Sequence, residues 1–395
     1  MHGLRGRGGR RLDSRCLRCG SSGFAAVSRS LSFHPCGMRG AARRIPTCLL
    51  TRDPDAVPRF RERTAEHDAW LAQVQEVVLE PELPICDPHH HLWDRRGDRY
   101  LLPELLADID SGHRIVSTVF VECAAGYRSD GPEHLRCVGE TEFVETVAEQ
   151  GARGAFGPIR ACAGIVGLAD CRRGAAVAEV LDAHLAASAR FRGIRHAAAC
   201  DPSPDVPDSH TRPIPELYRD PAFRAGFAEL APRGLSFEAW QYHHQLPLVT
   251  ELARAFPNTT IVLNHFSGPV FVGPHRGRQD EIFAVWKRDL AELARCPNVV
   301  AKLGGILMPR NGFGFEERDR PATSDEVVAT TGRWYRHAID CFGPQRCMFE
   351  SNFPVDRASV SYPVLWNAFK KLVADASPAE KAALFHDTAV RVYRI

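Results

Sequence analysis

Short apolar runs alternate with longer segments of helical periodicity from residue 85 to the end of the chain. Eight runs have the length and the β-branched or aromatic content of buried strands, at 85–91, 117–123, 162–168, 191–197, 235–241, 260–266, 299–305 and 347–353. Eight segments repeat apolar residues at helical spacing, at 140–150, 174–188, 221–231, 246–256, 279–295, 326–341, 360–373 and 378–387. Strands that alternate with helices indicate a parallel sheet. Eight such pairs predict an α/β fold of the (β/α)8 TIM-barrel type.

The chain before the first strand divides into two parts. Residues 1–52 are rich in Arg, Gly and Ser, and Asp13 is the one acid among residues 1–50. We interpret this part as a disordered extension, an organelle transit peptide or an untranslated upstream start, because transit peptides are rich in Arg and Ser and poor in acids. Residues 53–84 form a linker and a predicted helix over 59–80, which we expect to pack on the barrel of residues 85–395.

Composition narrows the class of protein. With 44% hydrophobic and 25% charged residues, the chain has a globular composition. The net charge is +2, and since residues 1–50 carry about +9, the rest carries about −7, which argues against a nucleic-acid partner. No apolar run approaches the roughly 20 residues of a membrane span, so no membrane partner is expected. Thirteen cysteines, mostly within apolar runs, suit a cytoplasmic protein, with an organelle as the alternative if the extension is a transit peptide.

Polar side chains collect at the carboxyl ends of seven predicted strands. In a TIM barrel, this edge of the sheet carries the catalytic residues. Each polar residue alone is explained by hydrogen bonds to loop backbone, but seven strands contributing together predict a site. The residues are His89, His91, Glu122, Arg195, His196, Glu238, Gln241, Asn264, His265, Lys302, Glu350 and Asn352.

The sharpest motif is DPHHHLWD at residues 87–94 of the first strand. Residues i and i+2 of a strand point to the same side, so His89 and His91 present two imidazoles to one point in the barrel mouth. Paired imidazoles suit a divalent metal such as Zn or Mn. His265, at the end of the sixth strand, strengthens the prediction of a metal site.

Three segments, DPHHHLWD (87–94), VLNHFSGPV (262–270) and MFESNFPVD (348–356), resemble the amidohydrolase superfamily, in its amidohydrolase-2 branch. This branch includes sugar lactonases, the pyrone-dicarboxylate lactonase and related decarboxylases. The resemblance covers about residues 85–395 and implies a hydrolase for a small-molecule substrate. It favours a lactone, or another cyclic ester or amide, of a carboxylated or sugar-derived compound, and it leaves a homo-oligomer open.

Position by position, the resemblance makes His89 and His91 a metal pair, His265 the sixth-strand histidine, and His243 a ligand or substrate contact after the fifth strand. Hydrolytic members end the last motif in an aspartate, whereas this chain has Asn352. A neutral amide cannot accept a proton from the attacking water.

Asn352 leaves three interpretations open. In the first, which we favour, another carboxylate acts as the base, with Glu350, Glu122, Glu238 and the loop residue Asp356 as candidates. In the second, the enzyme needs no strong base and is metal-free. In the third, the barrel binds a ligand without turnover. A decarboxylase of the same branch is a further alternative, although such an enzyme usually needs the aspartate of the last strand.

The remaining candidates are substrate contacts. Arg195 and Arg128 are expected to hold a substrate carboxylate, because a guanidinium binds a carboxylate through two parallel bonds. His265, Arg195 or Lys302 is expected to stabilise the oxyanion that develops during hydrolysis. The predicted substrate-binding set is Arg195, His196, His243, Lys302, Arg128 and Tyr127.

Overall fold

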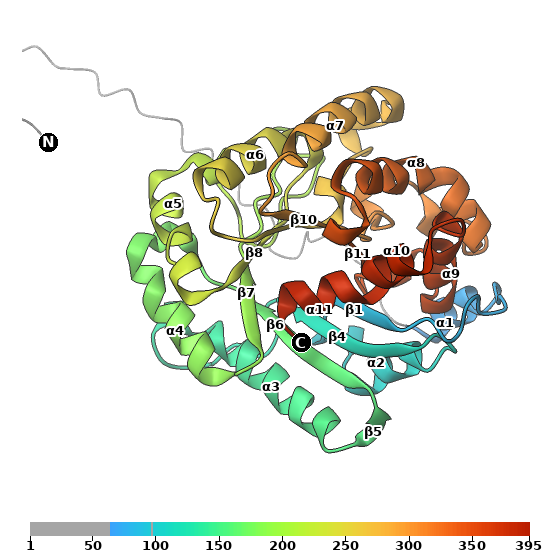
Figure 1. Cartoon of the computed structure of the whole chain (residues 1–395), viewed down its shortest axis with the longest axis horizontal. Coiled ribbons are helices and arrows are strands. Elements are labelled where there is room, and N and C mark those ends of the chain that lie inside the picture. Colours follow the sequence, from blue (N-terminus) through green and yellow to red (C-terminus); the bar gives the residue numbers. More distant parts are fainter. Residues whose placement is uncertain (1–63, 96–97) are drawn as a thin grey trace, which may run out of the picture. The chain divides into compact units, whose positions relative to one another are not determined.

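Eight parallel strands form a barrel with helices around it in the computed structural model, which describes residues 64–95 and 98–395 (Figure 1). Neighbouring strands pair in the order β1-β4-β6-β7-β8-β9-β10-β11. The strands are β1 Ile85–His90, β4 Ile115–Val121, β6 Arg160–Gly167, β7 Phe191–Arg195, β8 Ser236–Ala239, β9 Ile261–Leu263, β10 Val299–Leu303 and β11 Cys347–Phe349. All eight predicted strands are found in the predicted order, and the (β/α)8 barrel is confirmed.

The barrel closes between its first and last strands. His90 forms a parallel bridge with Phe353, which follows β11. The backbone N–H of Asn352 donates to the His89 carbonyl at 2.9 Å, and that of His91 donates to the Phe353 carbonyl at 2.8 Å. These bonds hold the last motif against the first, although the two lie at opposite ends of the barrel sequence.

Inward-facing apolar side chains fill the barrel, together with side chains from the last helix, α11 (Thr388–Tyr393). This helix lies at the amino ends of the strands, where Arg192 at the start of β7 donates to the Tyr393 carbonyl at 2.6 Å. A ligand therefore reaches the interior from the carboxyl ends. The core residues are Cys86, Val119, Val121, Val166, Val262, Val300, Met348, Ala389 and Tyr393.

Helices that follow the strands cover the outside of the barrel, as Figure 1 shows. In α8, Thr323 accepts from the Glu326 N–H at 3.2 Å and Glu326 accepts from the Thr323 N–H at 2.8 Å, which fixes the start of the helix. The bounds are α3 Val138–Ala152, α4 Ala178–Ala187, α5 Pro221–Phe227, α6 Leu246–Ala255, α7 Gln279–Leu293, α8 Ser324–Phe342, α9 Tyr362–Leu372 and α10 Pro378–Ala382. The helix predicted over 378–387 is α10 followed by a π-helical turn, Ala383–Asp387, that leads into α11.

The helix predicted over 59–80 is shorter than expected. Within the described residues it is α1, Ala65–Leu71, and residues 59–63 lie outside them, as does the Arg-rich extension over 1–52. After α1, the Glu76 carboxylate accepts from the Ser324 N–H at 2.8 Å. This tertiary hydrogen bond favours a non-helical path, and Val77, taken as part of the apolar stripe, is 87% exposed.

Five of the strands and α-helices were not predicted. Two short antiparallel strands, β2 Trp93–Arg95 and β3 Asp98–Tyr100, follow β1 and lead into α2, Leu102–Ile109. The other two are β5, Ala155–Pro158, and α11, which lies beyond the last predicted helix. Among the described residues, no helix combines the length and the apolar composition required to cross a membrane.

Candidate active site

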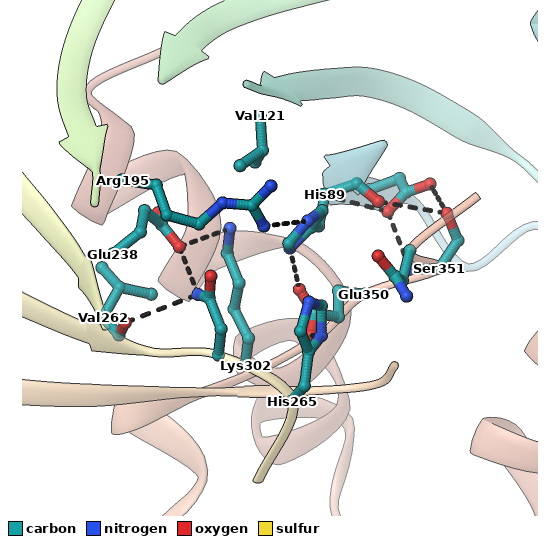
Figure 2. Close-up of polar contacts among 12 residues, drawn as sticks. His89, Val121, Arg195, Glu238, Val262, His265, Lys302, Glu350 and Ser351 are labelled. Atoms are coloured by element: carbon teal, nitrogen blue, oxygen red, sulfur yellow. Dashed lines mark hydrogen bonds and ion pairs between the residues drawn. The ribbon is translucent and has the colours of Figure 1, made fainter. Parts of the chain in front are cut away.

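Ionisable side chains gather in the barrel interior at the carboxyl ends of the strands, and Figure 2 shows several of them directed toward one another. The group consists of three carboxylates, two cations and two histidines, and none of these side chains is more than 6% exposed. They are His89, Glu122, Arg195, Glu238, His265, Lys302 and Glu350. The clustering at this edge that the sequence predicted is therefore present, and every one of these residues was among the expected strand-end set.

His89, His265 and Glu350 converge on one point. Glu350 Oε2 lies 2.6 Å from His89 Nδ1, and Glu350 Oε1 lies 2.7 Å from His265 Nδ1. The three ligand atoms lie within 4.8 Å of one another. Despite their proximity, His89 Nδ1 and Glu350 Oε2 are buried without a well-formed hydrogen bond. Two nitrogens and one carboxylate oxygen that face each other in this way fit a divalent transition metal.

The pKa values of this group reflect its burial. Burial lowers the pKa of His89 and of His265 well below the usual range, and the nearby Lys302 and Arg195 charges act in the same direction. Burial also raises the pKa of Glu350 to about 8, against the opposing effect of Lys302. Both imidazoles are therefore neutral at pH 7, which is the state that a metal ligand requires, whereas Glu350 would release a proton on binding a metal.

The backbone makes room for this group at Gly305. A Cβ atom at residue 305 would lie 2.0 Å from His265 Nδ1, and Gly305 has a φ of +67° that only glycine adopts freely. His265 itself has a φ of +52°, in the left-handed region that is uncommon for side-chain-bearing residues. This sharp turn after β9 brings the His265 ring over Glu350.

His91, the expected partner of His89 in a metal pair, lies beside it but outside the three-residue group. The two ring centroids are 5.0 Å apart. His91 Nδ1 donates to the Val121 carbonyl at 2.8 Å, so the neutral ring carries its lone pair on Nε2. The hydrogen bond to β4 therefore engages Nδ1 of His91. His265 and Glu350, rather than His91, form with His89 the group that could hold a metal ion.

Asn352, an expected catalytic residue, is hydrogen-bonded to the loop carboxyl of Asp356. Its side-chain amide donates to Asp356 Oδ1 at 3.0 Å, and its φ is +54°. Asn is among the residues that tolerate this conformation. Glu350, two residues earlier, supplies the carboxylate that Asn352 lacks.

Arg195 is tied to Glu122 and is not free to bind a substrate carboxylate. Arg195 Nε donates to Glu122 Oε1 at 2.6 Å, and Nη2 donates to the Glu122 carbonyl at 2.6 Å. Its Nη1 lies 3.3 Å from His89 Nε2. Burial acts to raise the pKa of Glu122, but His210 and Arg195 outweigh it and hold this pKa well below the usual range. A carboxylate of such low pKa is a poor proton acceptor, which argues against Glu122 as the base.

The charge of Lys302 is likewise balanced by a buried carboxylate, that of Glu238. Its Nζ lies 2.9 Å from Glu238 Oε2, and both side chains are fully buried. Glu238 also accepts hydrogen bonds from Tyr393 of α11 and from Asn264. The helix that closes the amino end of the barrel is thus connected to the charged layer above it.

Four residues predicted to bind substrate make contacts with residues outside this cluster. Arg128 pairs with Glu142 of α3 at the surface, because its loop folds back onto that helix. His196 follows Arg195 on the strand and faces the opposite way, where its Nδ1 accepts from the Cys171 N–H at 3.3 Å. The remaining two are His243, whose ring lies 5.3 Å from that of His244 at the rim, and Tyr127, which packs against the hydrophobic core.

One site residue was missed altogether. His210, in the long loop after β7, places Nε2 2.9 Å from Glu122 Oε2. In the sequence, only the length of the loop and its place after a strand, at the carboxyl ends of the barrel strands, pointed to this segment. No motif marks the histidine itself.

The chain is similar to several known proteins. Residues 86–395 match the family model described as Amidohydrolase. An uncharacterised protein of Sinorhizobium fredii, y4mH, is 34% identical over 342 residues, which cover 80% of this chain and 99% of the relative. An L-fucono-1,5-lactonase of Burkholderia multivorans is 26% identical over 324 residues, which cover 78% of this chain and 95% of the relative. A solved amidohydrolase of Burkholderia multivorans with bound zinc is 25% identical with a TM-score of 0.60, covering 79% of this chain and 99% of that chain.

Proposed function

The chain belongs to the amidohydrolase family, in its amidohydrolase-2 branch, and from this premise we propose that it hydrolyses the lactone of a neutral, sugar-derived compound. The family membership confirms the resemblance indicated by the three motifs, and with it a hydrolase. Two relatives named L-fucono-1,5-lactonase and one named L-rhamnono-gamma-lactonase support lactone hydrolysis. The observation that carries the proposal is the convergence of His89, His265 and Glu350 at the open end of the barrel.

The residues present fit a divalent metal. His89, His265 and Glu350 would hold it, since two of their ligand atoms are buried 2.6 Å apart without a well-formed hydrogen bond. A bound divalent ion would polarise the lactone carbonyl and lower the pKa of a water molecule. A ligand bond at His89 Nδ1 leaves the ring proton on Nε2, which faces Arg195 Nη1 at 3.3 Å. We therefore expect Arg195 to weaken metal binding.

Lactone hydrolysis needs a proton acceptor and stabilisation of the oxyanion. His91 offers an unprotonated Nε2, because its Nδ1 proton is held by the Val121 carbonyl. It accepts a proton from the attacking water as the carbonyl carbon gains the new C–O bond. Because Arg195 and Lys302 are already paired with buried carboxylates, the charge that stabilises the oxyanion would come from the divalent ion that the three-residue group would hold. The ring C–O bond then breaks, and the leaving alkoxide takes up the proton to give a hydroxy acid.

The pairing of charges favours an uncharged substrate. Arg195 is bound to Glu122 and Lys302 to Glu238, so neither of these two cations is left for a substrate carboxylate. Arg128, the other expected carboxylate contact, is bound to Glu142 at the surface. A dicarboxylated pyrone would have to separate a buried ion pair, which costs about 3–5 kcal/mol. Of the two substrate classes expected from the sequence, the structure therefore supports the sugar-derived one.

The test is acid release by the full chain, followed with a pH indicator, on sugar-acid lactones and on 2-pyrone-4,6-dicarboxylate. We expect turnover of the lactones alone, loss of activity after chelator treatment, and recovery with Zn or Mn. Glu350→Gln should be inactive and should not recover. Release of carbon dioxide from an aromatic acid would favour the decarboxylase alternative. Absence of acid release from every lactone, with metal supplied, would overturn the proposal.

A further inference from the structure

The loop after β7 brings His210 onto a buried carboxylate at the mouth of the barrel. His210 Nε2 lies 2.9 Å from Glu122 Oε2, and the Glu122 side chain is fully buried whereas that of His210 is 39% exposed. The loop has its own anchor, because Thr211 Oγ1 donates to the Ala197 carbonyl at 2.6 Å. His210 is therefore not the sole attachment of this loop. His210 is the solvent-facing member of a series of hydrogen-bonded side chains that continues through Glu122 to Arg195.

We propose that His210, held in place by Glu122, forms a hydroxyl-binding subsite that selects hydroxylated lactones over unsubstituted ones, an inference that rests on the proposed lactonase function. Glu122 is fully buried and engages Nε2 of His210, which leaves Nδ1 of the partly exposed ring for a ligand. This nitrogen can donate to, or accept from, a hydroxyl of the substrate. A hydroxyl of a sugar chain matches such a group, whereas an unsubstituted ring offers it no partner.

The geometry suits binding better than proton transfer. Arg195 fixes Glu122 with one bond to its side chain and another to its carbonyl, so the carboxylate that holds His210 is oriented before a ligand arrives. The same ion pairing keeps the carboxylate ionised and makes it a poor base. Sites that hydrogen-bond a substrate hydroxyl discriminate strongly against an analogue that lacks it. His210 therefore acts in specificity, with Glu122 as its positioning residue, separate from the His89, His265 and Glu350 group.

The experiment compares two lactones of the same ring size on the metal-loaded full chain. L-fucono-1,5-lactone carries hydroxyls, and δ-valerolactone carries none. We expect His210→Ala to raise KM for the hydroxylated lactone about tenfold to hundredfold, the worth of one hydrogen bond to a charged group. The kcat/KM for δ-valerolactone should fall by a much smaller factor, because no hydroxyl contact is lost. His210→Gln should recover part of the effect, since an amide also donates and accepts.

Thr211→Val is the matched control for the loop, because it removes the anchor to Ala197 and keeps the imidazole. It should affect both lactones alike. An equal loss on both lactones in His210→Ala, or no loss on either, would overturn the subsite. Hydrolysis of δ-valerolactone without any preference for the hydroxylated lactone would also overturn it while leaving the lactonase function intact. Failure to hydrolyse either lactone would instead overturn the proposed function, and the subsite with it.

Discussion

The side-chain amide of Asn352 donates to Asp356 Oδ1 at 3.0 Å, and both side chains are buried behind the last strand. Burial raises the pKa of Asp356 well above its usual range, and the Asn352 hydrogen bond only partly opposes this. The asparagine in the last motif therefore satisfies a buried carboxyl, while Glu350 presents the carboxylate to the histidines. Restoring an aspartate at position 352 would place a second carboxyl against Asp356 and not against His89.

We predict that Asn352→Asp adds no metal site and destabilises the fold by about 1–3 kcal/mol, because a buried donor is lost. Two buried carboxyls share a proton in the folded state that the unfolded chain releases near pH 4. The folded state then binds more protons, so the free energy of unfolding falls as the pH rises from about 5 to about 8. Urea unfolding at both pH values measures this fall. Asn352→Ala is the control, which loses the same bond but adds no second titrating carboxyl, and a gain of bound metal in Asn352→Asp would contradict the prediction.

We predict that Glu350→Gln loses the metal while keeping the fold. The amide has the shape of the carboxylate, but it lacks the charge that offsets a divalent ion among Arg195 and Lys302. Elemental analysis after dialysis should give about one ion per chain for the wild type and a small fraction of that for the variant. Glu140→Gln is the matched control, since Glu140 is a buried carboxyl whose Oε1 accepts from the Cys123 and Ala125 N–H groups, a role that an amide oxygen retains. Equal metal content in wild type and Glu350→Gln would remove Glu350 from the ligand set.

The barrel could be predicted because its strands are buried on both faces and read as apolar runs. The same reasoning failed for the segment after α1, where Val74 and Val77 continue the helical spacing although the chain is no longer helical. Glu76 decides that path through its bonds to Ser324 and Asn367, which lie far along the sequence. Apolar spacing contains no information on such tertiary bonds.

The sequence predicts which strand ends carry the site residues, but it does not predict which of these side chains contact one another. His89, His265 and Glu350 were each singled out because strand ends meet at one edge of a barrel. Whether a side chain then turns into the group depends on its hydrogen-bond partners. The Val121 carbonyl engages Nδ1 of His91, and Glu142 holds Arg128 at the surface. His210 lay beyond prediction, because the path of a long loop is set by tertiary contacts.

We predict that Glu122→Gln destabilises the protein by about 3–5 kcal/mol, the usual cost of leaving one member of a buried ion pair without its partner. Arg195 would remain as a buried charge beside His89. Chemical denaturation of the metal-free protein measures the change. Glu251→Gln is the comparison, because Glu251 binds Arg219 in a similar two-bond pair at the surface, and exposed pairs contribute far less. If the two variants lose equal stability, groups other than Glu122 stabilise the buried charge of Arg195.

The segment that follows α1 is attached to the barrel through Lys370 of α9, and this attachment carries a pH dependence. Lys370 Nζ donates to the Leu79 carbonyl at 2.8 Å and the Glu80 carbonyl at 2.9 Å, and it lies 2.8 Å from His113 Nδ1. Burial lowers the pKa of Lys370 to about 8, from an ordinary value of 10.5. At a pH between about 8 and 10.5, the unfolded chain therefore binds more protons at Lys370 than the folded chain does.

The free energy of unfolding should therefore gain a contribution from Lys370 as the pH rises from about 8 to about 10. Buried tyrosines whose pKa is raised act in the opposite direction, so the measurement is the difference between the wild type and Lys370→Met. This difference should shift in favour of the wild type with rising pH in urea unfolding. Lys371→Met is the matched control, because Lys371 is the next residue of the same helix and pairs with Asp325 at the surface. A difference that stays constant with pH would show that Lys370 keeps its ordinary pKa, with its charge stabilised by the two carbonyls.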